Sequence, residues 1–155
     1  MKIEPLTREA FAPFGEVIET AGTPLHINQG FADRFDDLCK VDVIEGGVVK
    51  VSIFEARPRP QPIKIDLMER HPLGSQAFYP LQNEDWLVLV CAHPLDANSF
   101  RCFRATGQQG VNYARNVWHF PLLVFAPSRF IIVDRKGPGV NLDEVTLKVE
   151  LSLAI

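Results

Sequence analysis

Short apolar runs, each ended by proline or glycine, limit what this chain can fold into more than any other feature. The 155 residues include twelve prolines and ten glycines, and almost no stretch keeps the 3.6-residue apolar spacing of a helix. Apolar and polar residues instead alternate with a period of two, the spacing of a half-buried strand. Such runs recur roughly every ten residues, so the sequence predicts an all-β sandwich or barrel of about ten short antiparallel strands.

Two alternating segments show which side chains face the core. Ile63, Ile65 and Leu67 are expected on one face of a strand, and residues 145–151 alternate in the same way near the C-terminal end. An apolar strand at the end of a chain often pairs its edge, or packs its face, against a second subunit. The segment 145–151 therefore predicts a contact between subunits.

Local signals predict one hairpin and one helix. Gly46-Gly47 separates two apolar runs within residues 41–54, and glycine readily adopts the positive φ that a tight hairpin turn requires. Residues 7–12 are expected to form a single short helix with Thr7 as its N-cap. The region 41–54 is therefore predicted to be a β-hairpin.

Three continuous apolar runs are typical of strands buried on both faces, namely residues 86–92, 122–125 and 130–133. No internal repeat, low-complexity tract or linker interrupts the chain. We therefore expect one domain, residues 1–155, with a core of ordinary size for that length.

Composition narrows the class of partner. The net charge is −3 and the longest apolar run has far fewer than the roughly twenty residues of a membrane span, so neither nucleic acid nor membrane is the expected partner. Cys39, Cys91 and Cys102 are odd in number and form no C-x-x-C pair, and the first residues lack a signal-peptide pattern. We expect a cytoplasmic protein that binds a small molecule, with Cys91 and Cys102 as core residues.

The first polar cluster surrounds His71. Glu69 and His71 are two residues apart and share one strand face, and the bend at Pro72 allows Gln76 to return to that face. A carboxylate, an imidazole and an amide brought together can ligate a divalent metal or hold a polar substrate. An edge-strand ion pair followed by a turn is the alternative interpretation.

The second cluster surrounds His119. Tyr113, Arg115, Asn116 and His119 lie within seven residues, and Trp118 lies beside the histidine. Such a density of hydrogen-bonding groups is unusual in an otherwise apolar barrel. The alternative is an aromatic core cluster that contains one histidine whose hydrogen bonds are satisfied.

Both clusters resemble known families. Glu69-x-His71-x4-Gln76 has the spacing of the first cupin metal motif, His-x-His-x4-Glu, and the segment around His119 is similar to the second. The stretches 69–78 and 110–119 more closely resemble the bacterial ureidoglycolate lyase family. Weaker similarity occurs elsewhere, including at His26.

The resemblance implies a cupin-like barrel, usually a homodimer, that cleaves (S)-ureidoglycolate to glyoxylate and urea during allantoin breakdown. It implies nickel or another divalent metal, with Glu69, His71, Gln76 and His119 as ligands if a metal is bound.

The same residues can serve as acid–base groups, with His71, His119 and Glu69 as the catalytic set. The substrate-binding candidates are Gln76, Tyr113 and Asn116, which can form hydrogen bonds, Arg115 or Arg70 for the substrate carboxylate, and His26.

Other functions remain compatible with the sequence alone. A ureidoglycolate amidohydrolase would release ammonia instead of urea, and it would normally need a stronger metal cluster to activate water. A non-catalytic cupin that binds a small carboxylic acid would need only the pocket. A purely structural domain would need neither.

Overall fold

The computed structural model of the protein describes residues 1–153, apart from the side chains of residues 149 and 150. The last two residues of the predicted domain, and Val149 of the predicted alternation, lie outside the described residues. Within them the chain forms fourteen strands, one short α-helix and two 3₁₀ turns, which confirms the all-β prediction. No helix in that range is long and apolar enough to cross a membrane.

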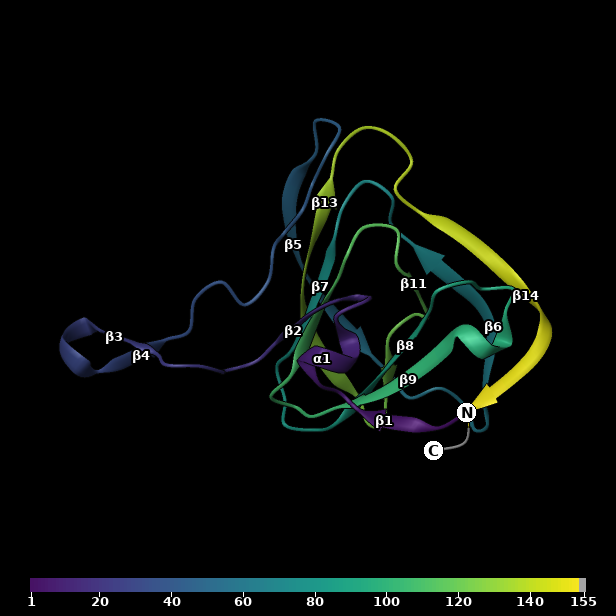
Figure 1. The fold of residues 1–155 in the computed structure, drawn as a ribbon, viewed down its shortest axis with the longest axis horizontal. Coiled ribbons are helices and arrows are strands. Elements are labelled where there is room, and N and C mark those ends of the chain that lie inside the picture. The colour runs from purple at the N-terminus through teal and green to yellow at the C-terminus, as the bar shows by residue number, and fades with distance from the viewer. Residues whose placement is uncertain (154–155) are drawn as a thin grey trace.

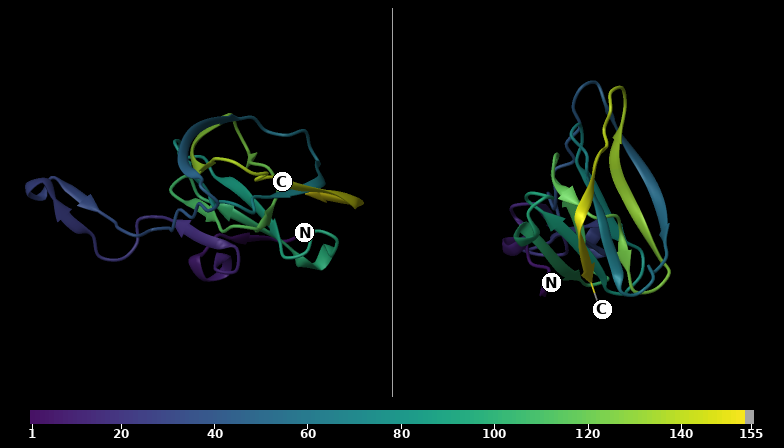
Figure 2. Two further views of the ribbon diagram at one scale, coloured as in Figure 1. Left: turned by 90° about the horizontal axis from the view of Figure 1, so that it is seen from above. Right: turned by 90° about the vertical axis from the view of Figure 1, so that its right-hand side faces the viewer.

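Two large sheets face each other (Figures 1 and 2). The seven-stranded sheet has the order β1 (Ile3–Pro5), β9 (Phe100–Ala105), β8 (Trp86–Cys91), β11 (Trp118–His119), β6 (Ile63–Arg70) and β14 (Asp143–Leu153), with β12 (Leu123–Val124) also paired to β8. The five-stranded sheet has the order β2 (Gly15–Ile18), β10 (Gly110–Tyr113), β7 (Gln76–Pro80), β13 (Ser128–Lys136) and β5 (Val48–Ala56). Within these two sheets all pairs are antiparallel except β1 with β9.

A third, two-stranded sheet forms an arm that projects from the body (Figure 1). It consists of β3 (Leu25–Ile27), the 3₁₀ turn η1 (Asn28–Gly30) and β4 (Ala32–Arg34). Its side chains are largely exposed, and Phe31 is 89% exposed. The arm therefore contributes little to the core of its own subunit.

Strand β8 is buried on both faces, as its continuous apolar run predicts. Trp86, Val88 and Val90 belong to the core cluster that both sheets enclose, whereas the alternate residues Leu87 and Leu89 belong to a second cluster on the other face. The two-residue period of a strand requires this separation. The run 86–92 therefore places β8 in the interior of the seven-stranded sheet.

The predicted N-terminal helix is present as α1 (Arg8–Phe11). The Thr7 side chain accepts a hydrogen bond from the backbone N–H of Ala10 at 3.1 Å, the usual N-cap contact. Phe11 is fully buried and packs edge-on against Phe103, with ring centroids 5.7 Å apart. The helix thus closes one end of the inter-sheet core.

The predicted hairpin within residues 41–54 is wrong, although its turn exists. Glu45 and Gly46 both have positive φ, as in a turn. However, β5 pairs with β13, and the segment before the turn forms only an isolated bridge between Val43 and Gly74. The buried Arg135 guanidinium donates to the carbonyls of residues 44 and 45, at 2.9 and 3.0 Å. These carbonyls are therefore satisfied by a side chain rather than by a hairpin ladder.

The alternation predicted from Ile63 changes phase within β6. Ile63 and Ile65 are buried, but the next fully buried residue is Met68 rather than Leu67. The register between β6 and β14 shifts at this point, as in a β-bulge. The shift turns Met68 toward the second apolar cluster, which contains Leu87 and Leu89 and is called the outer apolar cluster below. It leaves Glu69 on the inner face, between the two large sheets.

Candidate active site

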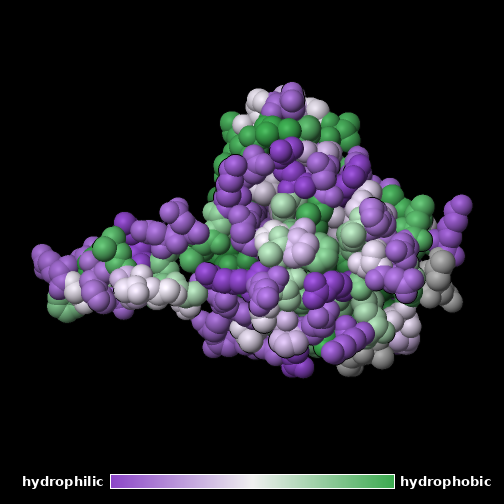
Figure 3. Space-filling model, in the orientation of Figure 1, coloured by the Kyte–Doolittle hydropathy of each residue, from purple (hydrophilic) through white to green (hydrophobic). Residues whose placement is uncertain are grey.

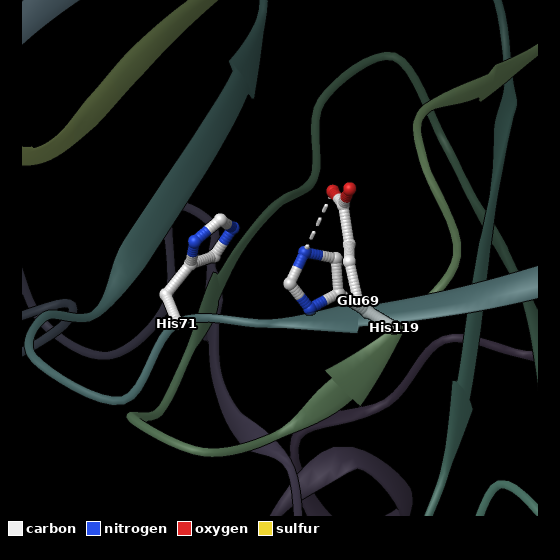
Figure 4. A group of neighbouring side chains, drawn as sticks. All are labelled: Glu69, His71 and His119. Atoms are coloured by element: carbon white, nitrogen blue, oxygen red, sulfur yellow. Dashed lines mark ion pairs between the residues drawn. The ribbon is translucent and has the colours of Figure 1, made fainter. Parts of the chain in front are cut away.

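Two neighbouring strands bring a carboxylate and an imidazole to the same position. Glu69 lies near the end of β6, and His119 on β11 is its direct partner in the antiparallel register. Paired residues project from the same face of a sheet, so both side chains point between the two large sheets. His71 follows β6 by one residue, and its ring faces the same point (Figure 4).

The three side chains form one compact group. The His119 Nε2 atom is 3.4 Å from the Glu69 Oε1 atom. One ligand atom from each of Glu69, His71 and His119 lies within 4.8 Å of the others, and the two imidazole centroids are 5.3 Å apart. Sequence positions fifty residues apart thus meet at one site.

Backbone carbonyls fix the tautomer of both histidines. The Nδ1 atom of His71 is 2.7 Å from the carbonyl oxygen of Asn141, and the Nδ1 atom of His119 is 3.0 Å from that of Val117. A carbonyl oxygen only accepts, so each Nδ1 carries the proton. Each buried Nε2 atom lacks a hydrogen-bond partner in the described structure. The Nε2 atoms of both rings therefore face the site and are available to a ligand or a proton.

The site favours an ionised carboxylate and a neutral His71. Burial alone would raise the pKa of Glu69, but the contact with His119 and the nearby positive charges of the histidines and Arg59 lower it overall. Burial also lowers the pKa of His71, against the opposing effect of its hydrogen bond to Asn141. At neutral pH the site therefore contains one anion and an unprotonated base.

Tyr113 and Gln76 complete the inner wall. The Tyr113 ring stacks on His119, with centroids 4.2 Å apart and planes 9° apart, and burial raises the pKa of its phenol. Gln76 pairs with Tyr113 across β7 and β10, and its buried Oε1 atom has no hydrogen-bond partner in the described structure. The stack holds the plane of His119, and Gln76 offers a free acceptor.

An open cleft of about 580 Å³ leads to this group. Glu69 and Gln76 lie along it, together with the apolar side chains of Phe54 and Leu122. Its remaining lining comes from Ile53, Glu55, Ala56, Arg57, Arg59, Phe78 and Pro121. The volume suits a small polar molecule rather than a polymer.

Sequence reasoning did not identify the two cleft arginines or Asn141. Arg57 and Arg59 occur in Arg57-Pro58-Arg59-Pro60. A proline after each arginine favours extended backbone, and in an extended segment side chains two residues apart point to the same side. This motif is the sequence signal that could have identified the pair. The role of Asn141 is made by its backbone carbonyl, so no side-chain pattern could have indicated it.

The structure places Arg70 and Arg115, the arginines predicted for the substrate carboxylate, outside the lining of the cleft. Arg70 is paired with Asp143 at 2.9 Å and stacks over Trp118, on the face of β6 and β11 opposite to Glu69. Arg115 is paired with Asp42 at 2.7 Å. Each guanidinium thus already has a carboxylate of its own.

The predicted site residues Asn116 and His26 also lie elsewhere. Asn116 is exposed in the turn before β11, where its φ of 67° and its backbone N–H bond to the His71 carbonyl shape the loop. His26 is in the projecting arm, paired with Asp33. Both side chains are exposed, and neither lines the cleft.

The thiols behave as the sequence predicts. Cys91 and Cys102 are buried in the outer apolar cluster, and burial raises the pKa of each to about 12. A thiol with so high a pKa is a poor nucleophile at neutral pH.

The donor atoms fit a divalent metal. The Nε2 atoms of His71 and His119 and the Oε1 atom of Gln76 are buried without partners, and the Glu69 carboxylate faces the two imidazoles. Such orphaned acceptors are costly unless a cation or a substrate donor satisfies them. Imidazole and oxygen ligands of this kind suit first-row metals, nickel included.

The fold and the site together define the class: a two-sheet β-sandwich with a Glu–His–His group in its interior, open to a cleft. Comparison with known proteins makes the assignment specific. The model of the ureidoglycolate lyase family matches residues 1–154, so the chain belongs to that family.

Curated relatives agree over nearly full length. A ureidoglycolate lyase of Burkholderia mallei is 52% identical over 157 residues, covering 99% of this chain and 92% of the relative. Ureidoglycolate lyase 1 of Rhizobium meliloti is 53% identical, covering 93% of this chain and 87% of the relative.

A solved structure of Bacillus subtilis oxalate decarboxylase, which has Mn(II) centres, is similar over 66% of this chain and 28% of that chain, with 13% identity and a TM-score of 0.39. A likeness of that extent carries no argument for the chemistry.

Proposed function

We propose that residues 1–155 form a single-domain lyase that cleaves (S)-ureidoglycolate to glyoxylate and urea at the Glu69–His71–His119 group, in allantoin breakdown. Family membership supports the reaction. The observation that carries the site is the convergence of one carboxylate and two unpartnered imidazole nitrogens within 4.8 Å of one another.

The reaction needs two proton transfers. Ureidoglycolate carries a hydroxyl, a ureido nitrogen and a carboxylate on one carbon. Removal of the hydroxyl proton lets the C–O bond become the aldehyde of glyoxylate while the C–N bond breaks. The electron pair of that bond stays on nitrogen, which takes a proton to give urea. One base and one acid therefore balance the step.

His71 is suited to accept the hydroxyl proton. Its Nδ1–H is fixed by the Asn141 carbonyl, and its Nε2 lone pair is buried and free. Because its pKa is lowered, the ring is neutral and able to act as a base at neutral pH.

His119 is suited to protonate the departing nitrogen. A proton on its Nε2 atom lies beside the Glu69 carboxylate, 3.4 Å away, and the stacked Tyr113 ring keeps the imidazole plane fixed. Glu69 thus faces the Nε2 atom and orients the ring. General acid and base assistance are each worth about 10²- to 10⁴-fold in rate.

A bound divalent metal, with nickel as our proposal, would be held by Glu69, His71, Gln76 and His119. When bound it supplies a Lewis acid that polarises the substrate oxygens. Gln76 and Tyr113 otherwise hydrogen-bond the substrate from the inner wall.

Matched histidine variants test the site. Replacing His71 or His119 by Asn keeps a donor for the backbone carbonyl but removes the Nε2 atom. We expect each variant to lose at least about 10²-fold in kcat. His93→Asn is the control, because His93 is exposed in a loop. Normal turnover by both site variants would refute the assignment.

We further propose a cytoplasmic homodimer. All three cysteines are unpaired, which favours a reducing compartment. The outer face of the five-stranded sheet carries Val51, 67% exposed, and Ile53, 53% exposed, opposite Val133 and Ile131 in register. Apolar surface also gathers at the top of the body in Figure 3. A second copy of the chain would cover the outer face of the five-stranded sheet, with the same surface used by both copies.

A further inference from the structure

The cleft holds a cation that the proposed acid–base group does not use. Arg59 lines the cleft on the segment between β5 and β6, together with Arg57. Both precede a proline, which favours extended backbone and so directs side chains two residues apart to the same side. The lining therefore contains two cations beside the carboxylates of Glu55 and Glu69.

Arg59 is held in the cleft that Glu69 also lines, and an aromatic ring fixes its position. Its guanidinium carbon lies 4.7 Å from the centroid of Phe120, whose own ring packs in the second apolar cluster. Its positive charge also contributes to the lowered pKa of Glu69. Stacking uses the face of the guanidinium and leaves its N–H edge available for a ligand.

The N–H edge of Arg59 has no hydrogen-bond or ion-pair partner among the described side chains, which leave out those of residues 149 and 150. Other arginines differ in this respect, because each is paired with an Asp or Glu of its own: Arg70, Arg101, Arg104 and Arg115. A planar fork with free donors matches a carboxylate bidentately. Arg59 is thus a cation held by stacking, near the Glu69 carboxylate but without an ion pair among the described side chains.

We propose that Arg59 binds the substrate carboxylate and so makes the site selective for α-hydroxy acid derivatives over carbinolamides that lack the acid. This inference rests on the proposed lyase function and assigns the carboxylate contact that Arg70 and Arg115 do not make. Holding the carboxylate fixes the neighbouring carbon, which carries both the hydroxyl and the ureido nitrogen, against His71 and His119.

A pair of substrates isolates this contact. N-(hydroxymethyl)urea has the same carbinolamide as ureidoglycolate but a hydrogen where the carboxylate stands, and its cleavage gives urea and formaldehyde. We expect Arg59→Ala to lower kcat/KM for ureidoglycolate by about 10- to 100-fold more than for N-(hydroxymethyl)urea. Most of the loss should appear in KM, and Arg59→Lys should restore part of it. Urea release is measured with correction for spontaneous decay.

Two controls and one binding measurement make the result decisive. Arg104→Ala removes an arginine that also stacks on a phenylalanine, Phe125, but that does not line the cleft. Arg57→Ala tests the neighbouring cation. Equal losses on both substrates for Arg59→Ala, or a selective loss only in Arg57→Ala, would overturn the proposal.

Binding of oxalurate, an unreactive ureido carboxylate, separates this proposal from the lyase function. Calorimetry should show affinity about 10- to 100-fold weaker in Arg59→Ala than in the unmodified protein. If the unmodified protein makes no urea, the lyase function fails, and oxalurate binding still decides the role of Arg59. Unchanged oxalurate affinity in the variant would contradict that role.

Discussion

At the scale of single residues, Glu69 has the most contacts that bear on the chemistry. It meets His119 at 3.4 Å, and its carboxylate stays ionised because the surrounding positive charges outweigh the effect of burial. Glu69→Gln keeps the size of the side chain but removes the charge. We expect kcat to fall by about 10²- to 10⁴-fold, since the acid and its orientation both depend on that charge.

Steady-state kinetics of Glu69→Gln should be compared with those of Glu144→Gln. Glu144 is the partner of Glu69 in the β6–β14 register, but its side chain is exposed. Comparable activity of the two variants would show that the charge of Glu69 has no catalytic role.

His71 makes a separate prediction about pH. Its pKa in the folded protein is lowered, chiefly by burial, from the ordinary histidine value of about 6.5. Between the folded and the unfolded pKa of His71, the unfolded chain therefore binds more protons than the folded one. The stability of metal-free protein should therefore fall as pH decreases below about 6.5 and should stop falling on this account below the folded pKa.

Urea unfolding at a series of pH values between about 7.5 and 5 measures this effect. His71→Asn should flatten the pH dependence in that window, because Asn keeps the hydrogen bond to Asn141 but does not titrate. Identical pH dependence in both proteins would contradict the assigned direction.

At the scale of elements, Arg135 explains how the segment before β5 is held. Its guanidinium donates to three backbone carbonyls, those of residues 44, 45 and 138, and the side chain is 6% exposed. Arg135→Leu leaves these carbonyls without donors. We expect the free energy of unfolding to fall by about 2–5 kcal/mol. Arg129→Leu, on the same strand but exposed, is the control. Equal stabilities in chemical denaturation would be inconsistent with this explanation.

The elements also show what the sequence could and could not predict. The helix capped by Thr7 and the strand β8, which is buried on both faces, are determined by residues close together in sequence. Local patterns therefore predict both. The spacing of Glu69 and His71 likewise predicts a shared face. Their meeting with His119 depends on a pairing fifty residues away, and the phase change at Met68 depends on the register with β14. Local alternation carries neither piece of information.

The carboxylate contact that we propose for Arg59 could not be predicted from the sequence for a related reason. Arg70 and Arg115 lie beside the site motifs in sequence, but long-range pairs with Asp143 and Asp42 direct them away. Arg59 lies ten residues before Glu69, and only the fold places it over Phe120.

At the scale of the whole molecule, the exposed apolar face of the five-stranded sheet predicts an oligomer. Light scattering should give about twice the chain mass of 17.4 kDa. Val51→Lys, on the outer face of β5, should dissociate the dimer because it places a charge in an apolar contact. Thr146→Lys, on the edge strand β14, is the matched comparison. Dissociation by Thr146→Lys alone would place the interface at the terminal strand, as the apolar pattern of residues 145–151 predicts.

Product analysis shows whether the protein cleaves ureidoglycolate to urea and glyoxylate. Metal-stripped and nickel-loaded protein are incubated with racemic ureidoglycolate, and glyoxylate, urea and ammonia are measured with correction for spontaneous decay. We expect urea and glyoxylate in equal amounts, without ammonia, from the nickel-loaded protein. Ammonia in place of urea would identify an amidohydrolase, and no turnover above background would leave a binding protein; either result would contradict the proposed lyase function.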